Sequence, residues 1–286
     1  MSILRVVSYN IHKGRSALGG RESLYDVRLG LYGLQPDLVF LQEVQGRNAQ
    51  SGILDAQHEA LAAGLQFEVA YGRNAVRRET DHGNALLSRY PIIGFENQDI
   101  SDHALEQRGL LHAKVFVQET EVHCFVVHLG LFAVSRVRQV QALADRIERL
   151  VPADAPVLIA GDFNDWTNRL SPLFVQRLGL HEVFSYAQHT SNIGMPRLRD
   201  SVKALRQALQ RGAGLSRAHQ RSHQLGHEGG YEPLPPPRTF PAAFPWLRLD
   251  RIYQRGFAVR SARVLRGKPW TQLSDHAPIV TELELP

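Results

Sequence analysis

A short apolar segment that ends in acidic and amide side chains constrains the fold of this chain more than any other feature. Val157-Leu158-Ile159-Ala160 is a continuous apolar run with Pro156 just before it, and such a run is typical of a strand buried on both faces. It ends in Gly161-Asp162-Phe163-Asn164-Asp165. Two interpretations stay open at this point. In an extended segment Asp162 and Asn164 point the same way and can offer oxygen ligands to Mg²⁺ or contact a phosphate. Alternatively, the strand simply ends in an Asx turn.

The order of the predicted elements indicates an α/β fold. The chain begins with a strand at residues 3–11, a helix at 23–34 and a second strand at 37–41, and this arrangement implies at least one parallel pair of strands. The amphipathic pattern of residues 134–150 predicts a long helix. We expect further elements at residues 58–64 and 172–178 (helices) and 83–88, 110–117, 121–127, 157–160, 246–253, 261–265 and 277–285 (strands).

Composition is that of an ordinary globular protein, with 43% apolar and 21% charged residues in 286,. The first residues have no signal-peptide pattern, and no later run approaches the ~20 apolar residues that span a bilayer. We therefore expect a cytoplasmic protein. Cys124 is the one cysteine and lies in an apolar run, so we expect it to be an inert core residue.

The positive charge of the chain is concentrated in one segment. Residues 187–240 hold eight Arg and Lys against three acidic residues, an excess that equals the net charge of +5 for the whole chain. We interpret residues 187–237 as a basic insertion in a single domain that spans residues 1–286. Such a segment suits a polyanion or an anionic membrane surface, although a solvated loop without a partner fits as well.

Polar residues stand at the ends of several predicted strands. Each is ordinary alone, since turn residues and solvated strand ends are common, but their repetition at one edge of a sheet indicates a site. The residues are Asn10, Glu43, His128, Asp162 with Asn164, Asp250, and the pair Asp275-His276 before the last strand.

With these motifs the sequence resembles the endonuclease/exonuclease/phosphatase superfamily, also called DNase I-like. The resemblance covers nearly the whole chain except the basic insertion. It implies a four-layer α/β/β/α sandwich, Mg²⁺ or Mn²⁺ at the strand ends, and hydrolysis of a phosphoester. It rests on an ordered set of motifs: Ser8-Tyr9-Asn10, Leu41-Gln42-Glu43-Val44, Gly83-Asn84-Ala85-Leu86-Leu87-Ser88, Val127-His128-Leu129, Gly161-Asp162-Phe163-Asn164, Leu249-Asp250-Arg251-Ile252 and Ser274-Asp275-His276.

The resemblance also implies a role for each motif residue. Glu43 is the expected principal metal ligand, with Asn10 and Asp275 nearby. Asp162 and Asn164 would contact the attacking water, the phosphate or a second metal, and His276 would pair with Asp250. Either His276 or Asp162 could be the general base, and we favour His276. The expected phosphate contacts are His128, Arg108 and Asn84.

The motifs do not select the phosphoester, because the superfamily acts on many. We favour a nuclease-type phosphodiesterase whose basic insertion holds a nucleic-acid backbone. The alternative is a phosphodiesterase or phosphatase for phospholipid head groups or small phosphoesters, with the insertion on an anionic membrane. A binding module without catalysis is the third hypothesis, and the presence of every motif residue argues against it.

Overall fold

The computed structural model describes residues 3–48, 56–103, 106–186 and 235–285. The predicted basic insertion therefore lies almost entirely outside the described residues, and its role stays a prediction. Among the described residues, no helix is long and apolar enough to cross a membrane.

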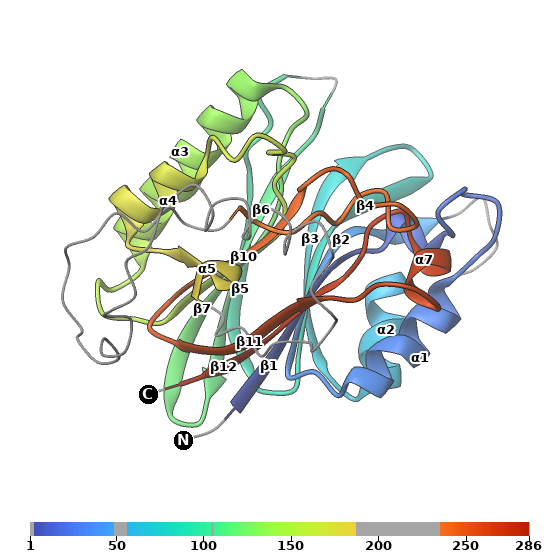
Figure 1. The fold of residues 1–286 in the computed structure, drawn as a ribbon, viewed down its shortest axis with the longest axis horizontal. Coiled ribbons are helices and arrows are strands. Elements are labelled where there is room, and N and C mark those ends of the chain that lie inside the picture. Colours follow the sequence, from blue (N-terminus) through green and yellow to red (C-terminus); the bar gives the residue numbers. More distant parts are fainter. Residues whose placement is uncertain (1–2, 49–55, 104–105, 187–234, 286) are drawn as a thin grey trace, which may run out of the picture. The chain divides into compact units, whose positions relative to one another are not determined.

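Two mixed sheets form the centre of the described fold (Figure 1). The first has the strand order β11-β12-β1-β2-β4-β3 and the second β5-β6-β7-β8-β10-β9. The strands of the first sheet are β1 (Ile3–Asn10), β2 (Leu38–Asn48), β3 (Glu68–Val76), β4 (Thr80–Ser88), β11 (Ala258–Val264) and β12 (Ile279–Glu284). Those of the second are β5 (Ile92–Asp99), β6 (Gly109–Val117), β7 (Thr120–His128), β8 (Val157–Asp162), β9 (His181–Glu182) and β10 (Asp250–Arg255).

Helices cover the outer face of each sheet. Figure 1 shows α1 and α2 on one side of the molecule and α3 and α4 on the other, with the sheets between them. The helical elements are η1 (His12–Gly14), α1 (Leu24–Leu34), α2 (Gln57–Leu65), α3 (Ala133–Leu150), α4 (Ser171–Leu178), α5 (Val183–Tyr186) and α7 (Trp270–Leu273).

Three apolar layers hold this arrangement together. Phe40 of the first sheet and Val126 of the second belong to one buried cluster between the sheets. Leu143 of α3 packs in a second cluster on the outer face of the second sheet. Leu31 of α1 packs in a third on the outer face of the first. Two sheets and two helical layers make the four-layer α/β/β/α sandwich that the sequence analysis predicts.

The structure corrects one predicted element. Residues 246–253 read as a single core strand, but β10 begins only at Asp250, and the Trp246 side chain is 57% exposed. Residues 239–247 instead form a turn, in which Phe240 and Leu247 pair through their backbones. Two prolines in this run, Pro241 and Pro245, explain why it does not continue a ladder of strands.

Candidate active site

The two central parallel pairs bring the site together at one edge of the sandwich. β1 pairs in parallel with β2, and β7 pairs in parallel with β8, so the carboxyl ends of all four strands lie at the same edge. There they border a cleft of about 420 Å³. Its lining includes seven of the predicted site residues: Glu43, Arg108, His128, Asp162, Asn164, Asp275 and His276.

A β-bulge places Glu43 in the cleft. The pairing of β2 with β4 skips from Leu41 to Val44, and Glu43 between them has a φ of 54°. The bulge turns this side chain out of the alternating pattern of the strand. Its carboxylate accepts a hydrogen bond from Asn10 Nδ2 at 3.3 Å and lies 3.8 Å from Lys13 Nζ. Burial opposes ionisation, but His128, Lys13 and Asn10 together lower the pKa of Glu43 to about 2, so it is a carboxylate at neutral pH.

Asn10 orients two carboxylates. Its buried amide nitrogen lies 3.3 Å from both Glu43 Oε1 and Asp162 Oδ2, and its oxygen accepts the backbone N–H of His12. In this orientation the amide oxygen is already engaged. The structure therefore places Asn10 in contact with Glu43 and Asp162, and its predicted role as a metal ligand stays a prediction.

Asp162 and Asn164 meet through a turn and not through an extended strand. Asn164 has a φ of 49°, and its backbone N–H donates to Asp162 Oδ1. The side-chain nitrogen of Asn164 donates to Leu129 O at 2.9 Å. An Asx turn therefore ends the strand, and both side chains still line the cleft. Their contact with a cation or a phosphate stays a prediction. Burial raises the pKa of Asp162 to about 6, although the nearby His276 works against this.

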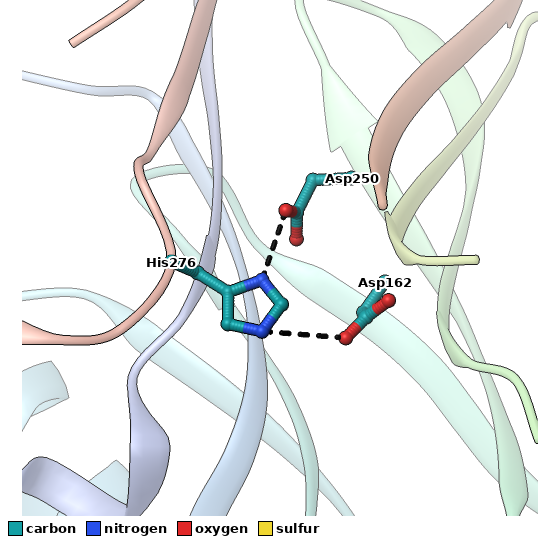
Figure 2. Close-up of side chains that lie close together, drawn as sticks. All are labelled: Asp162, Asp250 and His276. Carbon is teal, nitrogen blue, oxygen red and sulfur yellow. Dashed lines mark hydrogen bonds and ion pairs between the residues drawn. The ribbon is translucent and has the colours of Figure 1, made fainter. Parts of the chain in front are cut away.

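His276 lies between two carboxylates (Figure 2). Its Nδ1 is 2.9 Å from Asp250 Oδ2, and its Nε2 is 3.7 Å from Asp162 Oδ2. Burial alone would lower the pKa of His276, but the charge and hydrogen bond of Asp250, together with Asp162 and Asp275, raise it. Asp250 therefore holds a proton on Nδ1 and fixes the imidazole, with Nε2 directed toward Asp162 and the cleft.

Neutral and cationic groups line the cleft beside the carboxylates. His128 Nε2 lies 3.7 Å from Asp162 Oδ2, and burial together with Arg108 lowers its pKa to about 3. A neutral imidazole in this position can donate one hydrogen bond to a phosphate oxygen. Arg108 pairs with Glu106 at 3.0 Å and still lines the cleft. Lys13 and His82, which the sequence analysis missed, line it as well.

The residues present fit a hard divalent cation. Glu43 and Asp275 both line the cleft, and ionised carboxylate oxygens are the ligands that Mg²⁺ and Mn²⁺ prefer. Single ligand atoms of Asp162, Asp250 and His276 also lie within 4.8 Å of one another. The nitrogen of His276 that faces Asp250 carries the proton of their hydrogen bond, so only Nε2, which faces Asp162, is left to offer a lone pair there.

Asn84 occupies a structural position instead of the predicted phosphate contact. Its side chain is 1% exposed and donates to the backbone carbonyls of Gly109 and Val126. It therefore connects β4 of the first sheet with β6 and β7 of the second. Asn84 is not among the residues that line the cleft.

Arg251, which the sequence analysis did not single out, holds together two backbone segments that carry site residues. Its fully buried guanidinium donates to the carbonyls of Asp165, Arg248 and Asp250. It thereby connects the turn after β8 to the start of β10. The sequence motif contained Arg251, but an arginine in a strand usually points to solvent. Lys13 and His82 were detectable, because each adjoins a motif at a strand end.

Comparisons with known proteins show the family and the fold of this chain. Residues 7–276 match the model of the endonuclease/exonuclease/phosphatase family. The chain is 37% identical over 290 residues to the uncharacterized protein YbhP of Escherichia coli (strain K12), which covers 98% of this chain and 96% of YbhP.

Solved structures share the fold at low sequence identity. An endonuclease/exonuclease/phosphatase from Beutenbergia cavernae superposes with a TM-score of 0.70 at 20% identity, over 100% of this chain and 72% of the other. The protein from Bacteroides vulgatus gives 0.68 at 15%, over 100% of both chains. D. rerio TDP2 complexed with a single-strand DNA product gives 0.61 at 18%, over 99% and 100%. The chain belongs to the endonuclease/exonuclease/phosphatase family, whose members are generally hydrolases that act on phosphoesters.

Proposed function

We propose that this chain is a divalent-metal-dependent phosphodiesterase that hydrolyses its substrate by attack of water. One observation carries the proposal: carboxylates, a carboxylate-bound histidine and positively charged side chains from distant parts of the sequence line a single cleft. A phosphodiester is an anion, and this cleft offers both charge neutralisation and groups that can move a proton.

Each group supports one part of the reaction. Glu43 and Asp275 would hold Mg²⁺ or Mn²⁺, which when bound supplies positive charge to the phosphate. His128 and Arg108 would contact phosphate oxygens. Asp162 and His276 are the two groups that can move the proton of the attacking water. Asp250 fixes the imidazole of His276 in one tautomer and stabilises its charged form.

The test uses a soluble substrate that requires no recognition beyond the phosphodiester. We expect hydrolysis of bis(p-nitrophenyl) phosphate with Mg²⁺ or Mn²⁺ and its loss with EDTA. Glu43→Gln removes a metal ligand with little change in shape and should lower turnover by about two orders of magnitude or more. Glu22→Gln is the matched control, because Glu22 is exposed in the neighbouring loop. Equal turnover in Glu43→Gln and the wild-type protein would refute the proposed metal site.

Nucleic acid is the substrate class that the sequence analysis favours. Its main support is the basic insertion, which the structure does not describe, and the shared fold with the TDP2–DNA complex carries no substrate assignment. Nucleic acid therefore stays a candidate substrate with a direct test. If phosphates of the nucleic acid are bound by the basic segment, affinity for single-stranded DNA must fall steeply with salt. Salt-independent affinity would contradict it. The cytoplasmic location also stays a prediction.

A further inference from the structure

A turn without charged residues lies next to the catalytic cleft. Residues 239–247 read Thr-Phe-Pro-Ala-Ala-Phe-Pro-Trp-Leu. Phe244 near its tip is 82% exposed, and Trp246 is 57% exposed. Large apolar side chains with this exposure at a loop tip gain free energy when another surface covers them.

Part of the backbone of this turn is hydrogen-bonded within the turn. Thr239, Phe240 and Leu247 exchange backbone hydrogen bonds across the base of the turn, and Phe244 N donates to Pro241 O. Unpaired N–H and C=O groups make irregular backbone costly in an apolar phase. Because the base of the turn and Phe244 N are already paired, the turn can enter a lipid interface at a lower cost than a loop without such bonds.

The base of the turn is part of the catalytic wall. Ala242 N donates to Asp275 O, and Ala277 N donates to Thr239 O. The Phe240 ring packs against His276, with ring centroids 4.9 Å apart. A surface that binds the tip of the turn is therefore held next to the cleft.

Further exposed apolar side chains border the cleft from other loops. Leu131 and Phe132, which follow β7, are 57% and 62% exposed, and Trp166, which follows β8, is 44% exposed. Leu131 and Trp166 line the cleft directly, as do Phe240 and Leu247. We call Leu131, Phe132, Trp166, Phe244 and Trp246 the apolar rim. It brings apolar side chains from three separate loops to the mouth of a polar cleft.

Cations flank the turn. Arg238 precedes it and Arg248 follows it, and Arg266 donates to the carbonyl of Arg238. Lys268, two residues further along, is exposed, as are Arg238 and Arg266. An apolar tip with arginine and lysine beneath it is the pattern of a segment that inserts into the interface of an anionic bilayer.

We propose that the apolar rim docks on an anionic phospholipid bilayer and that the substrate is a phosphodiester in a lipid head group. This inference rests on the proposed phosphodiesterase function and gives it a substrate class. A surface for single-stranded nucleic acid combines aromatic rings with charges along a groove. The cations that flank the turn suit either partner. Residues 239–247 themselves have no charge, and aliphatic Leu131 adds apolar area without a ring for stacking, so the rim fits lipid better.

Binding is tested with vesicles of phosphatidylcholine alone and of phosphatidylcholine mixed with phosphatidylglycerol. We expect the wild-type protein to sediment with the mixed vesicles. Phe244→Asp and Trp246→Asp should each weaken binding by about tenfold or more, since each removes an exposed aromatic side chain that the bilayer would bury,. Phe95→Asp is the matched control, because Phe95 is 55% exposed on strand β5. Equal binding of all four proteins, or no binding by the wild type, would overturn the inference.

Activity separates this inference from the proposed function. With bis(p-nitrophenyl) phosphate, Phe244→Asp should retain wild-type turnover, whereas turnover of phosphatidylglycerol in vesicles should fall with binding. If Glu43→Gln loses both activities while Phe244→Asp keeps its turnover of vesicles, the docking surface is refuted. The proposed phosphodiesterase function is then still supported. Salt-dependent binding of single-stranded DNA without vesicle binding would replace lipid with nucleic acid.

Fluorescence gives a readout independent of catalysis. In a Trp166→Phe background the remaining tryptophans are Trp246 and the buried Trp270. We expect mixed vesicles that contain brominated lipid to quench Trp246 emission and to leave Trp270 unaffected. Absence of quenching under conditions where the protein sediments would contradict insertion of the turn.

Discussion

The pair formed by Asp250 and His276 offers the sharpest test of the proposed chemistry. Asp250 is 1% exposed and His276 is 5% exposed, and their 2.9 Å hydrogen bond joins a carboxylate to an imidazole away from water. Asp250→Asn preserves the size of the side chain but removes its charge. The substitution therefore changes the hydrogen bond without opening a cavity.

The size of the effect follows from the loss of a buried charge-assisted bond. When the imidazole is charged, such a bond stabilises it by about 2–4 kcal/mol more than the neutral hydrogen bond of an asparagine would. If that state lies on the reaction path, turnover should fall by about thirty- to a thousandfold. The assay is hydrolysis of bis(p-nitrophenyl) phosphate at saturating metal ion, with KM determined separately from kcat.

The pH profile distinguishes a catalytic effect from a structural one. Asp250 raises the pKa of His276, so its removal must lower that pKa. Whichever limb of the pH–rate profile belongs to His276 should move to lower pH in Asp250→Asn. A loss of turnover below about fivefold, or a profile that does not move while turnover falls, would refute the assigned pairing.

Three further predictions concern stability and can be measured by urea unfolding. A Cβ at Gly161 would lie 1.9 Å from Val127 O at a φ of 150°, so Gly161→Ala should lower the free energy of unfolding by about 3 kcal/mol or more. As controls, Gly179→Ala tests a positive φ without a close contact and should cost about 1 kcal/mol, and Gly20→Ala should cost almost nothing. Equal losses of stability in all three variants would contradict the close contact with Val127. His112 has a pKa lowered to about 3 by burial, His123 and nearby cations, so the unfolded chain takes up a proton below pH 6.5 that the folded chain refuses. Stability should then fall by about 1–2 kcal/mol between pH 7 and pH 5, and an equally steep fall in His112→Phe would exclude this histidine as the cause. Arg251→Lys cannot serve the carbonyls of Asp165, Arg248 and Asp250 together and should cost about 2 kcal/mol, whereas unchanged stability and turnover would show that the guanidinium does not organise the site.

Strands buried on both faces were predictable, while two partly exposed strands, β3 and β5, were missed. β8 stands out as an apolar run because both of its faces pack, one between the sheets and one against α3 and α4. β5 lies at an edge and mixes exposed with half-buried positions, so its sequence lacks a clear pattern of two. β3 was missed for the same reason. Trp246 shows the opposite error, because local hydrophobicity does not tell an inward side chain from an outward one.

The site was predictable as a set of residues, but not as a set of contacts. A polar residue at the end of a buried strand marks the edge where ligands gather, and this identified Glu43, His128 and Asp162. Contacts such as the bridge from Asn84 to the second sheet depend on sheet-to-sheet packing, which the sequence does not encode locally. The Glu43 bulge is another such case, since it appears only once β2 is paired with β4.

The architecture explains why the site depends on both halves of the chain. Glu43 and Asp275 belong to the edge of the first sheet, and His128, Asp162 and Asp250 belong to the second. His276 follows Asp275 in sequence, yet its imidazole contacts the carboxylates of the second sheet. The distance between the predicted metal ligands and the predicted proton carriers is therefore set by the apolar layer between the sheets. A large-to-small substitution in that layer, such as Phe40→Ala, should lower turnover even though it touches no catalytic group, because proton transfer tolerates little change in geometry. The same substitution on the outer face, such as Leu31→Ala in α1, should reduce stability by about 2–5 kcal/mol but leave the turnover of the folded fraction unchanged.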